Sequence, residues 1–299
     1  MGKIWRVSGP LVIADDMKGS QVYEIVEIGE EGIVGEIIGL EENKAIIQAH
    51  EDTLGLKTGE VVRGTGRILS AELGPGLVGS IYDGLQKSLL TLVEDTGSFI
   101  KRGAKAAALS REKKWQFTPK VKVGDAVSEG DIIGTVPETG LVEHKIMVPI
   151  GIKGRIKEIR KGDYTVEEPV AWVELDGEVK ELKLMQEWPV RKPRPYKQRL
   201  DPSGLLTTGM RILDYMFPLA LGGKASIPGG FGTGKTVALQ QLVRWAQTHL
   251  NIYVGCGERG NEMSDVLYSF RKLKDPNTGR LLQEKEIFIA NTSNMPVVA

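Results

Sequence analysis

Residues 227–236 read "IPGGFGTGKT" and match the pattern G-x-x-x-x-G-K-[ST]. Glycines in such a loop let backbone N–H groups turn inward around phosphate oxygens, at the positive end of the helix that follows. The preceding residues 224–228, "KASIP", predict a short strand. The following residues 236–250 predict a helix whose apolar face is made by Leu239, Leu242, Val243 and Ala246. This order of strand, glycine loop and helix indicates a phosphate-binding loop.

The side chains of this loop have distinct expected roles. Lys235 reaches the β- and γ-phosphates as a positive charge, and the Thr236 hydroxyl can ligate the magnesium ion that the phosphates bring. The alternative is a chance glycine-rich turn with an exposed lysine, which the strand and helix on either side disfavour. The predicted nucleotide-binding residues are Gly229, Gly230, Phe231, Gly232, Thr233, Gly234, Lys235 and Thr236.

A second polar group, "GCGERGNE" (255–262), follows an apolar run at 252–256 that predicts a buried strand. Open parallel sheets bind ligands beyond the carboxyl ends of their strands, so Glu258 and Arg259 are expected on the same rim as the phosphate loop. Glu258 suits the orientation of an attacking water, and Arg259 can offset charge on the transferred phosphoryl group. The alternative is that these carboxylates only favour the first turn of the next helix. We prefer that alternative for Glu262 and the catalytic role for Glu258.

Strands and helices alternate through the last third of the chain. Residues 207–220 and 261–273 predict helices, and residues 286–291 predict another strand. This alternation predicts a parallel sheet with helices on its faces. Cys256, the single cysteine, has no partner for an internal disulfide, which favours a reducing compartment, and we expect it to be a small core residue.

The N-terminal part of the chain is rich in short β-prone runs. Residues 3–69 carry such runs with glycine turns between them, which predicts a small antiparallel barrel with an assembly role. A short helix-like run ends the segment 73–92, and residues 120–166 predict a second β module. The predicted domains are therefore a β-barrel at 1–70, a β-rich insert with its linker at 71–190, and an α/β domain at 191–299.

Part of the insert, "VKVGDAVSEGDIIGTV" (121–136), looks like the strand-turn-strand of biotinyl and lipoyl carrier domains. In that comparison Lys145 would be the modified lysine. Biotin carriers place this lysine between two methionines at a hairpin tip, whereas only Met147 is near here. We therefore prefer a β-sandwich insert with a solvated Lys145.

Residues 188–199, "WPVRKPRPYKQR", combine three prolines with five basic residues. The prolines favour an extended connector between domains. The interleaved Trp188 and Tyr196 leave a nucleic-acid contact as the alternative, because aromatic rings can stack on bases. The chain carries 39 basic and 39 acidic side chains and no net charge, so we prefer the linker and expect no nucleic-acid partner.

No apolar run in the chain approaches the roughly 20 residues of a membrane span. The N-terminal residues 1–9, "MGKIWRVSG", also lack the apolar core of a signal peptide. We therefore expect a cytosolic protein.

Several motifs together resemble one family. "IPGGFGTGKT", "YVGCGERGNEM", "KDPNTGR" and "IANTSNMPV", with "ELGPGLVGSIYDG" and "VEHKIMVP" upstream, are similar to the catalytic A subunits of V/A-type rotary ATPases. The similarity extends from Ile4 to the last residue. It implies a β-barrel, a β-rich insert and a RecA-like domain with a phosphate loop, in that order.

The resemblance also implies an activity. Lys235, Glu258 and Arg259 would be the catalytic residues, with ATP or ADP and Mg²⁺ as ligands and Thr236 at the magnesium. The function implied is an ion-translocating ATPase or ATP synthase that moves protons or sodium ions. The implied partners are B subunits in an alternating A3B3 hexamer and the central and peripheral stalk subunits. The implied location is cytoplasmic, at the membrane only through the ion-translocating sector.

The sequence departs from this family after its last motif. The family continues with a Walker B strand, an adenine pocket and a helical domain, so we expect this chain to be an N-terminal fragment or a truncated product with little ATPase activity alone. Two alternatives stay open at this point. One is a RecA-like nucleic-acid translocase or protein-export ATPase, of which the export enzyme should lack the insert at 120–166. The other is an inactive truncated product.

Overall fold

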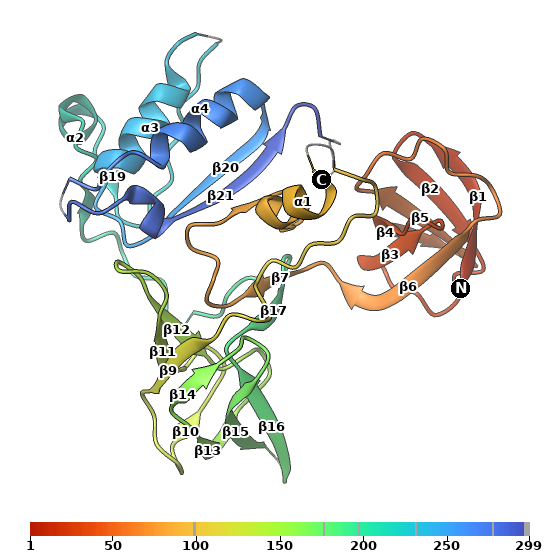
Figure 1. Ribbon diagram of the computed structural model, residues 1–299, viewed down its shortest axis with the longest axis horizontal. Helices are drawn as coiled ribbons and strands as arrows, with labels where there is room; N and C mark the ends of the chain where they lie inside the picture. Colours follow the sequence, from red (N-terminus) through yellow and green to blue (C-terminus); the bar gives the residue numbers. More distant parts are fainter. Residues whose placement is uncertain (98–99, 176, 197, 231, 277, 296–299) are drawn as a thin grey trace.

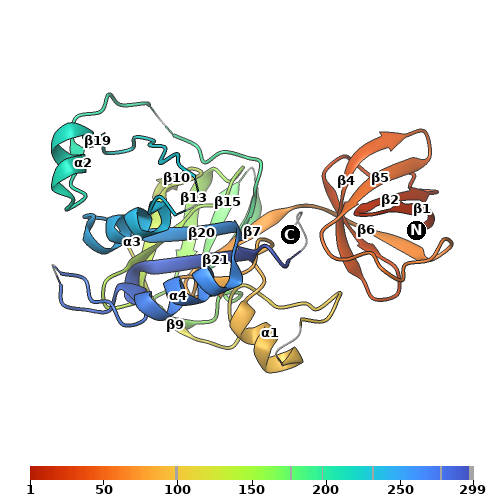
Figure 2. The ribbon, with the colours of Figure 1, turned by 90° about the horizontal axis from the view of Figure 1, so that it is seen from above.

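The computed structural model describes residues 1–97, 100–175, 177–196, 198–230, 232–276 and 278–295. Figure 1 shows three bodies: a barrel in red and orange, a β-rich insert in green and an α/β domain in cyan and blue. Seen from above in Figure 2, the barrel lies to one side of the other two bodies. The expected mixed fold, with barrel, insert and α/β domain in this order, is confirmed.

The first six strands close into an antiparallel barrel in the order β1-β2-β5-β4-β3-β6. Apolar side chains alternate along these strands with polar ones, so one set fills the interior, including Val12, Val26, Ile37 and Ile47. The barrel is closed because its first and last strands, β1 and β6, pair with each other. The strands are β1 (Gly2–Ser8), β2 (Leu11–Asp15), β3 (Glu24–Ile28), β4 (Ile33–Glu41), β5 (Lys44–Ala49) and β6 (Val61–Ile68).

The insert packs two four-stranded antiparallel sheets, β10-β13-β15-β16 and β12-β11-β9-β14, around a shared core. Phe117, Ile133 and Val136 are fully buried there. The exposed Lys145 lies within β12, opposite Thr135 on β11, and not at a hairpin tip, which agrees with the preference against a carrier domain. The strands are β9 (Trp115–Pro119), β10 (Ala126–Val127), β11 (Ile132–Pro137), β12 (Glu143–Met147), β13 (Gly154–Ile159), β14 (Gly162–Tyr164), β15 (Pro169–Leu175) and β16 (Glu178–Lys183).

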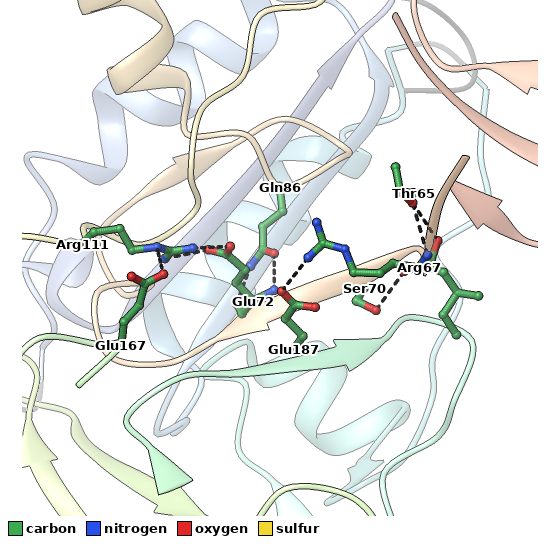
Figure 3. Close-up of polar contacts among 9 residues, drawn as sticks. Thr65, Arg67, Ser70, Glu72, Gln86, Arg111, Glu167 and Glu187 are labelled. Atoms are coloured by element: carbon green, nitrogen blue, oxygen red, sulfur yellow. Dashed lines mark hydrogen bonds and ion pairs between the residues drawn. The ribbon is translucent and has the colours of Figure 1, made fainter. Parts of the chain in front are cut away.

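A two-stranded neck forms where the chain enters and leaves the insert. β7 (Ser70–Leu73) pairs with β17 (Gln186–Pro189), so the two crossings are held side by side. Figure 3 shows the polar contacts around Glu72, a residue of β7 that bonds to several side chains. The Arg111 guanidinium bonds both oxygens of the Glu72 carboxylate, at 2.5 and 3.1 Å, and lies 3.0 Å from the Glu167 carboxylate. The Gln86 carboxamide exchanges two 2.8 Å hydrogen bonds with the Glu72 backbone.

The α/β domain is built on a parallel sheet in the order β20-β21-β8, which confirms the predicted parallel pairing. Its third strand, β8 (Ile81–Tyr82), comes from the segment between barrel and insert, within the range that we assign to the insert. The remaining elements are α1 (Leu89–Thr96), β18 (Leu205–Leu206), α2 (Arg211–Met216), β19 (Leu219–Ala220), α3 (Lys235–Trp245), β20 (Asn251–Glu258), α4 (Gly260–Phe270), the 3-10 helix η1 (Leu282–Lys285) and β21 (Glu286–Thr292).

One face of this sheet is covered by α4. Met263, Val266 and Phe270 pack there against Tyr253 and Phe288. On the opposite face of β20, Ile252 and Val254 are 59% and 58% exposed. The predicted buried strand is therefore buried on one face only, and the prediction of helices on both faces is wrong for β20. Cys256 shares this open face and is exposed, so its prediction as a core residue was also wrong.

Two local predictions in the α/β domain were also wrong. No strand forms at 224–228, because none of the described strands pairs with these residues and a strand needs a neighbour for its backbone hydrogen bonds. The helix predicted at 207–220 is reduced to α2, whose residues bury no side chain fully. Helices this short depend on tertiary packing, which is sparse around α2.

The basic connector is bound to the protein by its own side chains. Trp188 is buried, and the Arg194 guanidinium stacks on its ring at 3.9 Å from the centroid. Arg191 bonds both carboxylate oxygens of Glu36 in the barrel and lies 4.4 Å from the Tyr23 centroid. Because Arg194 stacks on it, the Trp188 ring is not available for base stacking.

In the described part of the chain, no helix is long and apolar enough to cross a membrane.

Candidate nucleotide site

The glycine loop is shaped by backbone conformations that other residues avoid. Gly232 and Gly234 have φ angles of 75° and 83°, in the left-handed region. The Thr233 hydroxyl donates a 2.9 Å hydrogen bond to the Gly230 carbonyl, and Lys235 Nζ donates to the Gly229 carbonyl. The Lys235 ammonium therefore rests on the loop's own backbone, where an incoming phosphate would compete with a neutral carbonyl.

The loop leads directly into α3. Gly234 is the N-cap residue, and no side chain caps the first turn. The first N–H groups of a helix have no partner within the helix, and together with the helix dipole they attract anions. The half-buried Lys235 and Thr236 stand at this end of the helix. The loop and the helix start thus provide backbone donors, an ammonium group and a hydroxyl in one place.

A cavity of about 980 Å³ joins this loop to the end of β20. Its volume lies near the upper end of the roughly 300–1,000 Å³ common for small-molecule sites. The lining includes Gly232, Thr233, Gly234, Lys235 and Thr236 from the loop, together with Gly257, Glu258 and Arg259. Gly229 and Gly230 lie outside the lining, and Phe231 lies outside the described residues. The cavity brings together two predicted groups that are more than twenty residues apart in sequence.

Glu258 and Arg259 occupy the turn from β20 into α4. Glu258 is the last residue of the strand and is half-buried, while Arg259 is the exposed N-cap residue of α4. Glu262 lies in the first turn of α4, as predicted, where a carboxylate favours the positive end of the helix. Burial raises the pKa of the Tyr253 phenol, and the carboxylates of Glu258 and Glu262 raise it further. Glu258, Arg259 and Glu262 all line the same cavity as the loop.

The donor set of the cavity suits a magnesium ion that arrives with phosphates. Mg²⁺ prefers oxygen ligands and is usually held by one or two protein groups together with phosphate oxygens and waters. The Thr236 hydroxyl supplies one such oxygen at the cavity wall. Within the described ranges, no group of three or more His, Cys, Asp or Glu side chains could hold a metal ion.

The cavity also contains residues that the sequence patterns did not single out. Gln240 lies one helical turn after Thr236, and Asp265 reaches the cavity from α4. Asn291, near the end of β21, lies outside this lining and accepts a hydrogen bond from the Gly257 backbone N–H. The i, i+4 spacing from Thr236 could have indicated Gln240. Asn291 could have been suspected because it ends the predicted strand 286–291 on the rim where ligands bind.

Three family models match the chain in succession. Residues 4–66 match the beta-barrel domain of the ATP synthase alpha/beta family, and residues 106–191 match the ATP synthase alpha/beta subunit barrel-sandwich domain. Residues 209–299 match the nucleotide-binding domain of the ATP synthase alpha/beta family. The three matches follow the same order as the three bodies in Figure 1.

Curated relatives extend this similarity over the whole chain. The A subunit of the A-type ATP synthase from Thermococcus sibiricus is 60% identical over 301 residues, which cover 100% of this chain and 52% of the relative. The corresponding subunits of Staphylothermus marinus and Methanopyrus kandleri are 58% and 54% identical, again over 100% of this chain and over 50% and 51% of the relatives. The chain spans about half the length of the curated relatives it matches.

Proposed function

Because this chain belongs to the ATP synthase alpha/beta family, we propose that it is the nucleotide-binding part of the catalytic A subunit of a V/A-type rotary ATPase. In this function, ATP hydrolysis or synthesis is coupled to the translocation of protons or sodium ions. The observation that carries the proposal is the single cavity lined by the Gly232–Thr236 part of the loop and by Glu258 and Arg259.

The loop binds the phosphate chain of ATP or ADP. Its glycines expose backbone N–H groups, and the positive end of α3 adds to their attraction for an anion. Lys235 leaves the Gly229 carbonyl and bonds the β- and γ-phosphate oxygens, because a charged acceptor is stronger than a neutral one. We propose that Gly229, Gly230 and Phe231 also belong to this nucleotide-binding loop.

Glu258 and Arg259 act at the γ-phosphate. The Glu258 carboxylate orients the attacking water and accepts its proton as the bond to the γ-phosphorus forms. The bond from this phosphorus to the β–γ bridging oxygen breaks in the same displacement, so ADP and inorganic phosphate are the products. Arg259 and Lys235 offset the charge on the transferred phosphoryl group. In the synthesis direction the same groups hold ADP and inorganic phosphate, and water leaves. Thr236 is the residue that would hold a magnesium ion, which would further offset the charge of the phosphates.

The partners and location follow from the same proposal. The relatives are subunits of A-type ATP synthases, which are multi-subunit complexes. We propose that this chain works beside B subunits in an alternating A3B3 hexamer that contacts central and peripheral stalk subunits, on the cytoplasmic side of a membrane. We also propose that the chain divides into domains at residues 1–70, 71–190 and 191–299. The insert that is present and the occupied Trp188 ring both disfavour an export ATPase or a nucleic-acid translocase.

Nucleotide binding by this chain tests the phosphate site directly. We expect MgATP to raise the melting temperature, because a ligand that binds only the folded state stabilises it. Lys235→Ala should weaken the ATP affinity by at least about tenfold, because the variant loses roughly one charge-assisted hydrogen bond to the phosphates. Lys224→Ala is the matched control, since Lys224 is exposed and does not line the cavity. Equal ATP affinities for the parent chain and Lys235→Ala would contradict the proposal.

A further inference from the structure

Strand β20 ends in a β-bulge one residue before Glu258. Along the pairing with β21, Cys256 lies opposite Asn291 and Glu258 lies opposite Thr292, so Gly257 is an extra residue without a partner position. Gly257 has a φ angle of 67°, in the left-handed region that glycine adopts without strain. The bulge therefore changes the alternation of side chains at the point where the strand reaches the cavity.

This change decides the face of the sheet on which Glu258 lies. Ile252, Val254 and Cys256 alternate onto the open face, and an uninterrupted strand would place Glu258 there as well. With the bulge, Glu258 lies on the opposite face. A Cβ atom built on Gly255, a residue of that opposite face, would be 3.3 Å from Glu258 Cγ. The raised pKa of the buried Tyr253 phenol, due first to burial and then to the Glu258 carboxylate, fits the same placement.

The bulge is fixed by the end of β21. The Gly257 N–H donates a 3.3 Å hydrogen bond to Asn291 Oδ1, and the Glu258 carbonyl accepts a 2.8 Å hydrogen bond from the Ser293 N–H. Asn291 is only 9% exposed. Because Asn291 is the register partner of Cys256, its side chain leaves the sheet on the open face and reaches the bulge from there. It thus gives the extra N–H of the bulge an acceptor that the regular ladder does not offer.

We propose that Asn291 is a positioning residue for Glu258: its carboxamide oxygen holds the Gly257 bulge, and the bulge turns the Glu258 carboxylate toward the phosphate loop. This inference rests on the proposed function, in which Glu258 orients the attacking water. Asn291 itself does not line the cavity. Its removal therefore acts on the catalytic step, while the phosphate loop continues to bind nucleotide.

The test compares turnover and nucleotide affinity in the complete subunit within its assembled complex. Asn291→Ala removes the acceptor and should lower kcat by about 10- to 100-fold, because small misplacements of a catalytic group have effects of this size. KM and the ATP dissociation constant should stay within about twofold of the parent values, because the contacts that bind the nucleotide in the ground state are unchanged. Asn291→Asp keeps an oxygen acceptor at the same position and should restore most of the turnover.

Glu258→Gln and the double variant separate the two proposals. If Asn291 acts through Glu258, Asn291→Ala should not slow an enzyme that already carries Glu258→Gln. Loss of turnover in Glu258→Gln combined with a normal kcat in Asn291→Ala would overturn the role of Asn291 and leave the proposed function intact. Full turnover in Glu258→Gln would instead overturn the proposed role of Glu258. A parallel rise in the ATP dissociation constant of Asn291→Ala would show a general structural effect and also overturn the positioning role.

Discussion

The Glu138 carboxylate accepts a 2.6 Å hydrogen bond from the backbone N–H of Gly76, across 62 residues of sequence. Glu138 follows β11 in the insert, and Gly76 lies on the segment that leads to β8 of the α/β sheet. The same carboxylate accepts a 2.9 Å hydrogen bond from the Val78 N–H and lies 2.8 Å from His144 Nδ1. Its side chain is 1% exposed. The next residue, Thr139, donates from its hydroxyl to the Glu284 carbonyl, so this turn anchors the insert to the start of two sheet strands.

Removal of this anchor should destabilise the chain. In Glu138→Ala the Gly76 and Val78 N–H groups lose their acceptor, which should lower the free energy of unfolding by about 2 to 4 kcal/mol. Urea unfolding at neutral pH measures the change. Glu143→Ala is the control, because Glu143 is an exposed residue of the same hairpin and should change stability by less than about 0.5 kcal/mol. Equal losses in both variants would contradict the anchor.

The anchor should also depend on pH. Burial raises the pKa of Glu138, but the hydrogen bonds from His144 and from the backbone of Val78 and Gly76 outweigh it and hold the pKa below the usual 4.5. A lowered folded-state pKa contributes stability above the unfolded pKa, and this contribution is lost as pH falls through the folded value. The stability difference between the parent and Glu138→Gln should therefore shrink below pH 4.5. A difference that stays constant from neutral pH into that range would argue against an ionised Glu138.

Glu286 should respond to pH in the opposite direction. It is 1% exposed, and burial raises its pKa to about 7, although Lys285 and Asn251 lower it in part. The folded state then binds a proton that the unfolded state releases, so stability falls as pH rises from 4.5 to about 7. Glu286→Gln should raise the free energy of unfolding at pH above that window by about 1 to 3 kcal/mol and have little effect below it. Exposed Glu112→Gln is the control, and a stabilisation that is equal at all pH values would contradict the raised pKa.

The connection between linker and barrel should depend on Arg191. Its guanidinium bonds both oxygens of Glu36, with Arg191 Nη2 at 2.8 Å from Glu36 Oε2, and Glu36 is a buried barrel residue. Arg191→Ala leaves this carboxylate without its cation and should cost about 2 to 4 kcal/mol. Lys192→Ala, at the neighbouring exposed position, should be close to neutral. Thermal unfolding of the two variants measures the difference, and unchanged stability in Arg191→Ala would show that the pair contributes little.

The open face of β20 makes a prediction about Cys256. An exposed thiol reacts with a soluble thiol reagent without unfolding, whereas a buried one requires a local or global opening. Because the chain has one cysteine, a single labelled site is expected in the folded chain. The labelling rate should lie within about tenfold of the rate in denaturant. Labelling that occurs only after urea is added would show that this face is covered.

Patterns confined to short stretches predicted their structures well. The short β-prone runs and glycine turns of residues 3–69 indicated a small antiparallel barrel, and the apolar spacing after the glycine loop indicated α3. The helix is shorter than expected and ends at Trp245, because Ala246 adopts an extended backbone. The roles of Lys235, Thr236, Glu258 and Arg259 stay predictions, although the cavity brings all four together.

Features that depend on distant neighbours could not be predicted in the same way. Residues 224–228 have suitable strand composition but find no strand partner, while the two residues of β8 join a sheet whose other members lie far along the chain. Cys256 has the apolar neighbours of a core strand, yet its exposure depends on whether another element covers that face. Pairing and coverage are properties of the folded chain, and local composition does not contain them.

The amino-acid order alone was enough to predict a helix directly after the glycine loop and a strand that ends near Glu258, because each depends on the spacing of a few adjacent residues. The face of the sheet that Glu258 occupies, in contrast, is known only from the folded chain. It depends on the Gly257 bulge and on the hydrogen bond from Gly257 to Asn291, which lies on another strand. A strand's side chains alternate with period two, so one extra residue held by a distant acceptor reverses the direction of every side chain after it.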